Sequence, residues 1–281
     1  MTEKIYILLP VHNRRETTRR FVACLRAQTF ANYQLILIDD GSTDGTAEMV
    51  LESIPGATVI RGKGDWWWAG SLQQGLNWLK AAKPAADDVV LFINDDVVLD
   101  PDFLCAGVRI LREKPDSLLL ARIRDPESGR ILETGVHADV RRLSFVTATA
   151  PDSINCLSTR GLFARCSIVE RMGGFHPRVL PHYLSDYEWT MRASCRGVRC
   201  ITDGRLVLES PNKCASGYWD FTKVAGLGEY LLLVFSKKSH ANPLYWSTFV
   251  LLASDWPAIP YWIAKIWVRF LREVFRRALP Q

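Results

Sequence analysis

The sequence predicts an α/β fold with a doubly wound, mainly parallel β-sheet. Short apolar runs alternate with helix-like segments over the first 120 residues, and polar clusters follow several of these runs. Such alternation is typical of βαβ units, in which the carboxyl ends of parallel strands meet at one edge of the sheet and bind ligands there. Of the 281 residues, 48% are hydrophobic, so the chain can bury a sizeable core.

The expected elements follow one another regularly up to residue 120. Apolar runs predict strands at 5–9, 34–38, 57–60 and 88–93. Apolar residues at helical spacing predict helices between them, at 15–28, 46–53 and 70–82. Pro101 opens a further helix, because proline is tolerated at the first helical position. Residues 121–242 mix short strands, turns and short helices, and we expect them to complete a site over the sheet edge.

Residues 243–281 form an aromatic and basic C-terminal segment. Residues 263–279 predict an amphipathic helix with Trp267 and Phe270 on its apolar face. Residues 265–281 hold five basic residues and one acidic residue, which is +4 of the chain's net +5. Such a helix is typical of the interface of an anionic membrane, with an ordinary packed helix or a subunit contact as the alternative. The preceding stretch, 244–263, is interrupted by Asp255, Pro257 and Pro260, so we do not expect it to span a membrane.

Charge and cysteine usage narrow the function classes. Outside residues 265–281 the net charge is only about +1, whereas a nucleic-acid-binding protein normally has a broad basic face, so we expect no nucleic-acid partner. The seven cysteines are scattered and form no Cys-x-x-Cys motif, which favours reduced thiols in the cytoplasm. The N-terminal MTEKIYILLP becomes polar too soon for a signal peptide.

Two adjacent acids follow the fourth predicted strand, in the segment Asn94-Asp95-Asp96. Neighbouring carboxylates at a strand end repel each other unless a cation joins them. Hard cations such as Mg²⁺ and Mn²⁺ bind carboxylate oxygens together with substrate phosphates. The segment therefore predicts a metal held against a diphosphate, and a solvated turn is the alternative.

Three further polar segments accompany this one: PVHNR at 10–14, DDGSTDGT at 39–46 and SDYE at 185–188. Together, over about residues 4–210, the four segments resemble glycosyltransferase family 2, the inverting enzymes with the GT-A fold. The resemblance implies that residues 1–120 bind a nucleotide-sugar and that residues 121–242 form the catalytic, acceptor-side half. The segment Trp67-Trp68-Ala69-Gly70 is similar to that of bacterial rhamnosyltransferase-type members.

The resemblance implies a donor site at the sheet edge. Asp39 and Asp40 would contact the base and ribose of the nucleotide, and Asn94 stands where the family has the first acid of its Asp-x-Asp motif. Aromatic faces beside an acid suit a sugar or its nucleotide. The residues expected to bind the donor are Pro10, His12, Asn13, Arg14, Asp39, Asp40, Asp65, Trp67, Trp68, Asn94 and Asp95.

The resemblance also implies a metal site and a base. Asp96 takes the metal position, and Glu209 stands where members often have a histidine ligand, so Mg²⁺ or Mn²⁺ is the expected cofactor. Asp186 would be the catalytic base, although Ser185 replaces the usual glutamate before it; a helix-capping role is the alternative. His182 and Arg192 are candidates for acceptor or phosphate contacts, or else a structural histidine and a surface ion pair.

These features predict an inverting, metal-dependent and non-processive glycosyltransferase. The donor would be a dTDP-rhamnose-like sugar or a UDP-sugar, and the acceptor a hydroxyl of a glycan or lipid-linked oligosaccharide in surface polysaccharide synthesis, such as O-antigen. We expect the protein in the cytoplasm, peripheral at the inner face of a bacterial membrane. Asn94 and Ser185 keep open a non-catalytic nucleotide-sugar-binding protein of the same fold. A sugar-nucleotidyltransferase is disfavoured because no glycine-rich loop follows the first strand.

Overall fold

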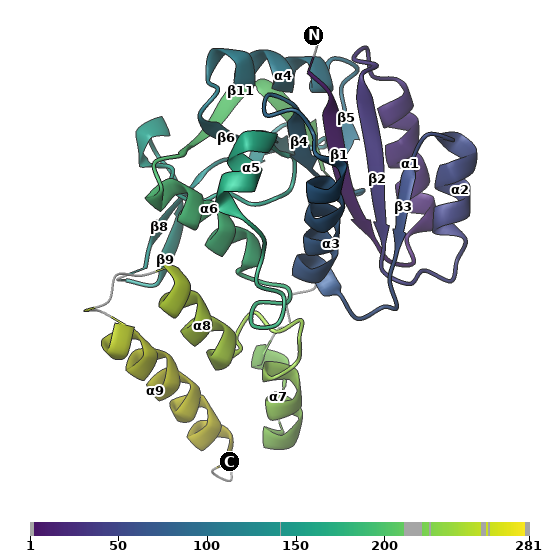
Figure 1. Cartoon of the computed structure of the whole chain (residues 1–281). Coiled ribbons are helices and arrows are strands. Elements are labelled where there is room, and N and C mark those ends of the chain that lie inside the picture. The colour runs from purple at the N-terminus through teal and green to yellow at the C-terminus, as the bar shows by residue number, and fades with distance from the viewer. Residues whose placement is uncertain are drawn as a thin grey trace.

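The computed structural model describes residues 3–140, 142–210, 221–224, 226–253, 257 and 259–278. A mixed β-sheet with helices on both faces forms the body, and the last three helices lie together at one end of it (Figure 1). The predicted α/β architecture with a C-terminal helix is confirmed.

The first half of the chain alternates as predicted. Its elements are β1 (Ile5–Val11), α1 (Arg15–Arg26), β2 (Tyr33–Asp39), α2 (Thr46–Ser53), β3 (Thr58–Arg61), α3 (Trp67–Ala82) and β4 (Val89–Phe92). The strands pair in parallel in the order β3-β2-β1-β4. Helix α3 starts three residues before the predicted position, so Trp67 and Trp68 belong to its first turn.

The second half makes the sheet mixed. Its elements are β5 (Val98–Leu99), α4 (Phe103–Glu113), β6 (Ser117–Arg124), β7 (Ile131–Glu133), β8 (Val136–Asp139), β9 (Ser144–Thr147), η1 (Pro151–Ser153), β10 (Leu162–Arg165), α5 (Cys166–Met172), α6 (Ser185–Cys195) and β11 (Arg199–Glu209). Strand β10 lies antiparallel between β4 and β6, and β11 pairs in parallel with β6. The hairpin β8–β9 forms a separate two-stranded sheet.

Two hydrophobic layers cover the sheet. Ile5, Ile7 and Leu9 of β1 face the layer built by α1, α2 and α4, whereas Tyr6 and Leu8 face the layer built by α3, α5 and α6. Successive strand residues point to opposite faces, and both faces are buried here. This explains why the central strands read as continuous apolar runs rather than as alternating patterns.

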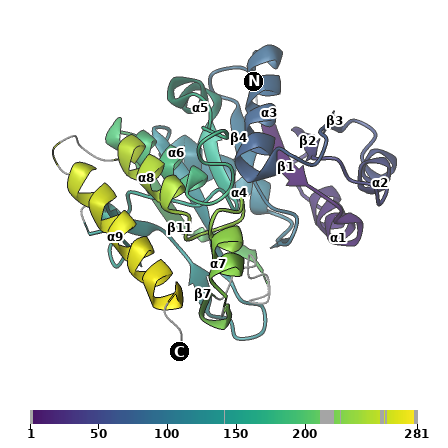
Figure 2. The same cartoon turned by 90° about the horizontal axis from the view of Figure 1, so that it is seen from below.

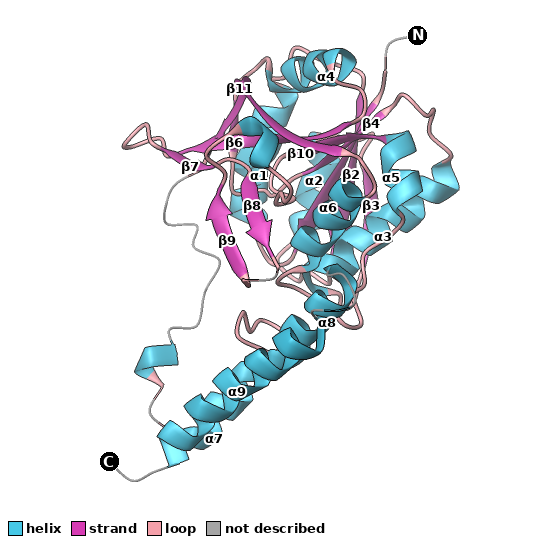
Figure 3. Ribbon diagram, turned by 90° about the vertical axis from the view of Figure 1, so that its left-hand side faces the viewer, coloured by secondary structure: helices cyan, strands magenta, loops and turns pink. Residues whose placement is uncertain are grey.

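The C-terminal segment consists of η2 (Phe221–Lys223), α7 (Leu227–Val234), α8 (Pro243–Ala253) and α9 (Ile259–Ala278). Helix α8 packs against α6 of the body and against α9, which runs beside α7 (Figures 1 and 2). From the side, α9 extends away from the sheet (Figure 3). Among the described helices, none combines the length and the apolar character needed to cross a membrane. Asp255, one of the predicted interruptions, lies outside the described residues.

Candidate active site

A cavity of about 1630 Å³ opens at the carboxyl ends of β1 and β4. Typical small-molecule pockets hold about 300–1,000 Å³, so this cavity has room for two ligands side by side. Its walls come from the loops after β1, β2 and β4, the first turn of α3, the region of β7–β9, helix α6 and the C-terminal segment. The predicted site residues that line it are Pro10, His12, Arg14, Asp40, Trp67, Trp68, Asn94, Asp95, Asp96, His182 and Asp186.

Asp40 holds the donor-side loop in place. Its carboxylate accepts backbone N–H groups of Gly64 at 2.9 Å, Trp66 at 2.9 Å and Trp67 at 3.1 Å. Trp66 and Trp67 lie at the start of α3, where N–H groups have no partner within the helix, and Gly64 lies in the loop before it. The ring Nδ1 of His12 lies 2.6 Å from the carbonyl oxygen of Asp40. Asp40 thus both lines the cavity and fixes the conformation of the loop that carries the tryptophans.

Asp39 and Asn13 support the neighbouring turn and are not among the lining residues. The buried Asp39 accepts the N–H of Ser42 at 2.8 Å. Asn13, at a φ of 50°, donates its N–H to the Ser42 hydroxyl at 2.9 Å and accepts the N–H of Thr43 at 2.8 Å. The structure therefore shows the turn-forming role of both residues, and their contact with a nucleotide stays a prediction.

Two of the three consecutive tryptophans face the cavity. Trp68 donates its indole N–H to the Thr159 hydroxyl at 3.0 Å. The Trp67 ring lies 6.1 Å from the His182 ring, and Lys238 Nζ lies 5.7 Å from the Trp67 ring centre. Asp65, predicted to bind the donor, is exposed and outside the cavity lining. Asp65 lies two residues before the first residue of α3.

Arginines, rather than a third acid, surround the paired acids after β4. Asp95 is buried and accepts hydrogen bonds from Arg14 Nε at 2.8 Å and from the Thr18 hydroxyl at 2.8 Å. Burial raises the pKa of Asp95, against the lowering effect of Arg14. Asp96 faces the cavity, with Arg160 Nη2 at 3.4 Å and Arg14 Nη2 at 3.7 Å from its carboxylate oxygens. The repulsion between the two acids is thus offset by guanidinium groups.

The donor set fits a divalent cation shared with a diphosphate. Asn94 Oδ1 is a buried oxygen atom without a hydrogen-bond partner among the described residues, and Asp96 Oδ1 has only the ion pair with Arg160 at 3.4 Å. Within the same part of the chain, no group of three or more histidine, cysteine or acidic side chains is placed to hold a metal. Mg²⁺ often uses only one or two carboxylates together with waters and substrate phosphates. Asp96 therefore fits as the protein carboxylate of such a site.

Glu209, predicted as a metal ligand, forms an ion pair within the protein. Its carboxylate pairs with Arg124 Nη2 at 2.8 Å, and it is not among the cavity-lining residues. Arg192 likewise binds within the protein. It donates to the buried Glu188 from Nε at 2.7 Å and to the carbonyls of Met172 and Gly174. In the structure Arg192 is thus an ion-pair partner at the buried side of α6, and its contact with an acceptor or phosphate stays a prediction.

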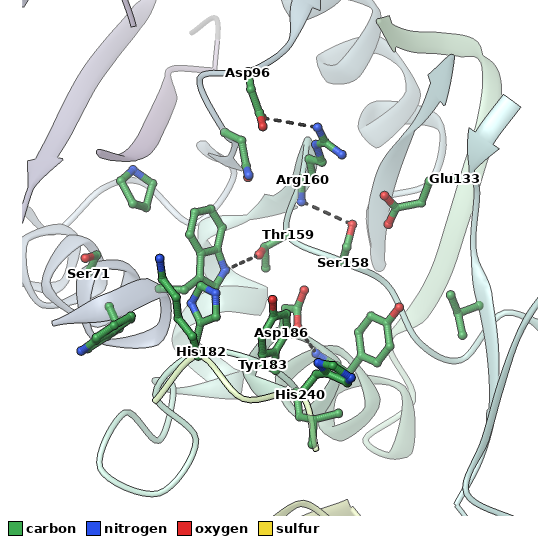
Figure 4. Close-up of a pocket in the computed structure, with 18 of the residues that line it drawn as sticks. Ser71, Asp96, Glu133, Ser158, Thr159, Arg160, His182, Tyr183, Asp186 and His240 are labelled. Carbon is green, nitrogen blue, oxygen red and sulfur yellow. Dashed lines mark hydrogen bonds and ion pairs between the residues drawn. The ribbon is translucent and has the colours of Figure 1, made fainter. Parts of the chain in front are cut away.

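Asp186 lies in the first turn of α6 and projects into the cavity (Figure 4). One of its carboxylate oxygens accepts the N–H of Tyr187 at 2.9 Å. Burial raises the pKa of Asp186 from 3.8 to about 6, and the nearby Glu133 carboxylate adds to the effect. A carboxylate with this pKa is ionised at neutral pH, yet basic enough to accept a proton from an alcohol in a transition state.

His182 lines the cavity on the side of Trp67. Burial lowers the pKa of His182 to about 4, and the positive charge of Lys238 acts in the same direction. The ring is therefore neutral at pH 7, with one nitrogen donating and the other accepting. Its Nδ1 has no hydrogen-bond partner among the described residues. His182 is thus suited to hydrogen bonding with a substrate hydroxyl rather than to binding a phosphate by charge.

Several lining residues were not predicted from the sequence. Glu133 ends β7, and burial raises the pKa of its carboxyl. Arg160 precedes Gly161, whose φ of 89° marks a tight turn before β10. An arginine beside a glycine was the one sequence signal that could have indicated Arg160 as a site residue. Lys238 and His240 reach the cavity from the C-terminal segment. No periodicity or motif marks Glu133, Lys238 or His240.

The fold and the cavity define an α/β protein with a large site at the carboxyl edge of its parallel strands. Residues 6–168, more than half of the chain, match the family model described as glycosyl transferase family 2. The chain belongs to this family. The predicted family and GT-A fold are confirmed.

Relatives and solved structures agree with this assignment. The chain is 26% identical over 225 residues to the O-antigen biosynthesis protein RfbC of Myxococcus xanthus, covering 73% of this chain and 17% of that protein. It is 27% identical over 176 residues to the uncharacterized protein y4gI of Sinorhizobium fredii, covering 61% of this chain and 18% of that protein. The chain thus spans less than a fifth of either relative.

Two solved structures share the fold over almost the whole chain. The crystal structure of S. aureus TarS 1–349 superposes with a TM-score of 0.58 at 16% identity, covering 98% of this chain and 72% of that one. The mannosyltransferase PcManGT from Pyrobaculum calidifontis, in complex with GDP-Man and Mn²⁺, superposes with a TM-score of 0.57 at 14% identity, covering 98% and 83%.

Proposed function

We propose that this glycosyltransferase is inverting, metal-dependent and non-processive, and that it transfers a sugar from a nucleoside diphosphate to a hydroxyl of a glycan or lipid-linked acceptor in surface polysaccharide synthesis. One observation carries the proposal. Asp96 and Asp186, which are far apart in the sequence, line one cavity that is large enough for donor and acceptor together (Figure 4). The similarity to an O-antigen biosynthesis protein supports the pathway class.

In this proposal each of four side chains has a part in the reaction. Asp186 removes the proton of the acceptor hydroxyl as its oxygen attacks the anomeric carbon of the donor sugar. The bond from that carbon to the diphosphate oxygen breaks on the opposite face, so the configuration inverts. Arg14 and Arg160 neutralise charge that develops on the leaving diphosphate. A divalent cation at Asp96, when bound, would supply Lewis-acid stabilisation of the same oxygens.

The donor is a dTDP-rhamnose-like sugar or a UDP-sugar in this proposal. The tryptophans at the start of α3 support a donor pocket with an aromatic wall, and Asp40 supports a nucleotide at the sheet edge. Solved structures of the same fold carry UDP, UDP-GlcNAc and GDP-Man, which supports a nucleotide-sugar but does not select the base.

The test is transfer or hydrolysis measured with a panel of nucleotide-sugars, with Mn²⁺, with Mg²⁺ and with EDTA. We expect one donor to be consumed with release of its nucleoside diphosphate, and EDTA to suppress the rate. The main alternative is a nucleotide-sugar-binding protein without turnover, which the replacements at Asn94 and Ser185 favour. If a nucleoside diphosphate raises the melting temperature but no donor is consumed, this alternative replaces the enzyme proposal.

Peripheral attachment to the cytoplasmic membrane face is part of the proposal. Trp267 and Phe270, predicted on the membrane-facing side of the helix, instead contact Ser247 of α8 and Tyr230 of α7. The side chains that α9 exposes are Tyr261, Val268 and Phe275, with 62%, 55% and 66% of their surfaces accessible. Exposed basic residues accompany them on the same helix, at Lys265, Arg269, Arg272 and Arg276. Apolar and basic side chains side by side suit the headgroup region of an anionic bilayer.

Vesicle binding tests this attachment without disturbing the packed face of α9. The double variant Val268→Ser, Phe275→Ser changes only exposed positions, whereas truncation would remove the contacts of Arg277 with the carbonyls of Phe221 and Val224. We expect the wild type to sediment with vesicles that contain phosphatidylglycerol, and the variant to remain in the supernatant. Equal sedimentation of the two proteins would contradict membrane attachment through this face.

A further inference from the structure

The cavity has an aromatic part of its wall that the proposed mechanism does not use. It consists of Phe145 on β9, Tyr187 on α6 and Trp246 on α8, and all three line the cavity. They come from three separate parts of the chain, including the C-terminal segment. None of the three was predicted as a site residue from the sequence.

Packing holds this wall in one arrangement. The Phe145 ring stacks on Tyr187 at 5.5 Å between centroids with planes 25° apart, and it meets Trp246 at 5.8 Å and 60°. Behind it lies the fully buried Phe249, at 5.8 Å from the Phe145 ring. The Trp246 indole N–H donates to the carbonyl of His240 at 2.8 Å, which sets the orientation of the indole. The wall is therefore formed before any ligand arrives.

The wall lies beside the proposed base. Tyr187 directly follows Asp186 on α6. The cavity lining also includes two polar residues, Glu133 at the end of β7 and Thr147 at the end of β9. A pyranose ring has the matching chemistry, since its C–H groups give it an apolar face and its hydroxyls surround the edge. Aromatic walls with a few polar groups are the usual lining of sites for such ligands.

Resting on the proposed function, we propose that Phe145, Tyr187 and Trp246 form the acceptor subsite, where they bind the face of the sugar ring whose hydroxyl is deprotonated by Asp186. The donor side is already accounted for by Asp40, Asp96 and the arginines, at the sheet edge.

The same wall includes a residue of a helix that exposes apolar side chains. Trp246 belongs to α8, and this helix exposes Leu244 and Leu251, each at least half accessible, on the outside of the C-terminal segment. A lipid-linked sugar bound at Trp246 would thus have apolar protein surface close to its lipid. The acceptor class that fits is a glycan whose terminal pyranose is attached to a lipid or to further sugars.

Octyl glycosides of glucose, galactose, mannose, N-acetylglucosamine and rhamnose are suitable probes, used below their micelle concentrations. Binding to the full chain is measured by titration calorimetry in the presence of a nucleoside diphosphate that stabilises it. We expect at least one glycoside to bind the wild type, and Trp246→Ala to weaken it by about 10-fold or more, as for buried aromatic anchors in general. Trp246→Phe keeps a ring and should retain most of the affinity.

Matched controls separate loss of the ring from loss of the fold. Trp78→Ala also removes a half-buried indole, but Trp78 contacts Tyr6 and lies outside the cavity lining, so glycoside affinity should be unchanged. If Trp246→Ala does not fold, Phe145→Leu and Tyr187→Leu, which keep apolar volume without a ring, should show the same loss. The melting-temperature shift caused by the nucleoside diphosphate should persist in every folded variant.

Two results would overturn the subsite. One is a wild type that binds no glycoside of the panel although it binds the nucleotide. The other is full glycoside affinity in the variants that lack a ring. Failure of the proposed function looks different, because then no nucleotide-sugar is consumed by the wild type. If transfer occurs and the variants keep the wild-type KM for the acceptor, only the subsite is wrong.

Discussion

Replacement of Asp186 by asparagine should inactivate the enzyme and stabilise the protein. The loss of activity follows from the loss of the base, which general-base catalysis sets at roughly 10²–10⁴-fold. The gain in stability follows from burial. The folded state raises the pKa of Asp186 from 3.8 to about 6, which corresponds to roughly 3 kcal/mol of unfavourable free energy for the ionised form. Asparagine carries no charge and can still accept the N–H of Tyr187.

The pH dependence has a definite sign. Because the folded-state pKa is the higher one, the contribution of Asp186 to stability is complete below pH 3.8 and is lost as the pH rises through about 6. The variant should therefore exceed the wild type in free energy of unfolding at pH 8 by up to roughly 3 kcal/mol, and the excess should shrink at pH 4–5. Urea unfolding at pH 4.5 and pH 8 measures both values.

Activity supplies the second readout of the same pKa. In the wild type, kcat/KM should fall on the acid side with a midpoint near the pKa of about 6, so that at pH 5 about a tenth of the neutral-pH value remains. Initial rates of nucleoside diphosphate release over pH 4.5–8 measure this profile. An acid limb near pH 4, or a variant that is no more stable than the wild type at pH 8, would refute the buried-base reasoning.

Three further substitutions test other parts of the site. Asp40→Ala leaves the backbone N–H groups of Gly64, Trp66 and Trp67 without their acceptor and should lower the free energy of unfolding by about 1–3 kcal/mol. An unchanged urea midpoint would show that water replaces the carboxylate. Arg160→Ala should weaken nucleoside diphosphate binding by about 10-fold or more in calorimetry, whereas the matched Arg165→Ala, outside the cavity lining, should not. Arg192→Ala breaks a buried ion pair and should destabilise by about 3–5 kcal/mol; normal stability with impaired donor or acceptor binding would restore the substrate-contact role.

Local patterns were sufficient to predict the elements that build the site. The apolar strands and the polar residues at their ends follow from burial on both sheet faces, so the positions of Asp40 and Asp96 near one edge could be derived from the order of the segments, whereas Asp186 was placed beside them by the family resemblance. Family resemblance added their roles. The conformation of each loop could not be derived, because Asp40 binds backbone groups that become neighbours only when α3 packs on the sheet.

The opposite wall of the cavity depends on contacts between distant parts of the chain. Glu133 comes from a short edge strand, and Trp246 from a helix beyond the family match, which ends at residue 168. No local pattern indicates that Glu133 or Trp246 lines the same cavity as Asp186. The same limit explains Glu209 and Arg192, for which motif position suggested a ligand, whereas packing supplied Arg124 and Glu188 as partners.

The most direct test of the central claim is a crystal structure with an intact nucleotide-sugar and Mn²⁺. Asp186→Asn is the suitable protein, because it should bind the donor without turning it over. We expect the diphosphate beside Asp96 and Arg160, and the anomeric carbon facing residue 186 across open cavity. A diphosphate bound elsewhere, or an anomeric carbon shielded from residue 186 by the protein, would contradict the account.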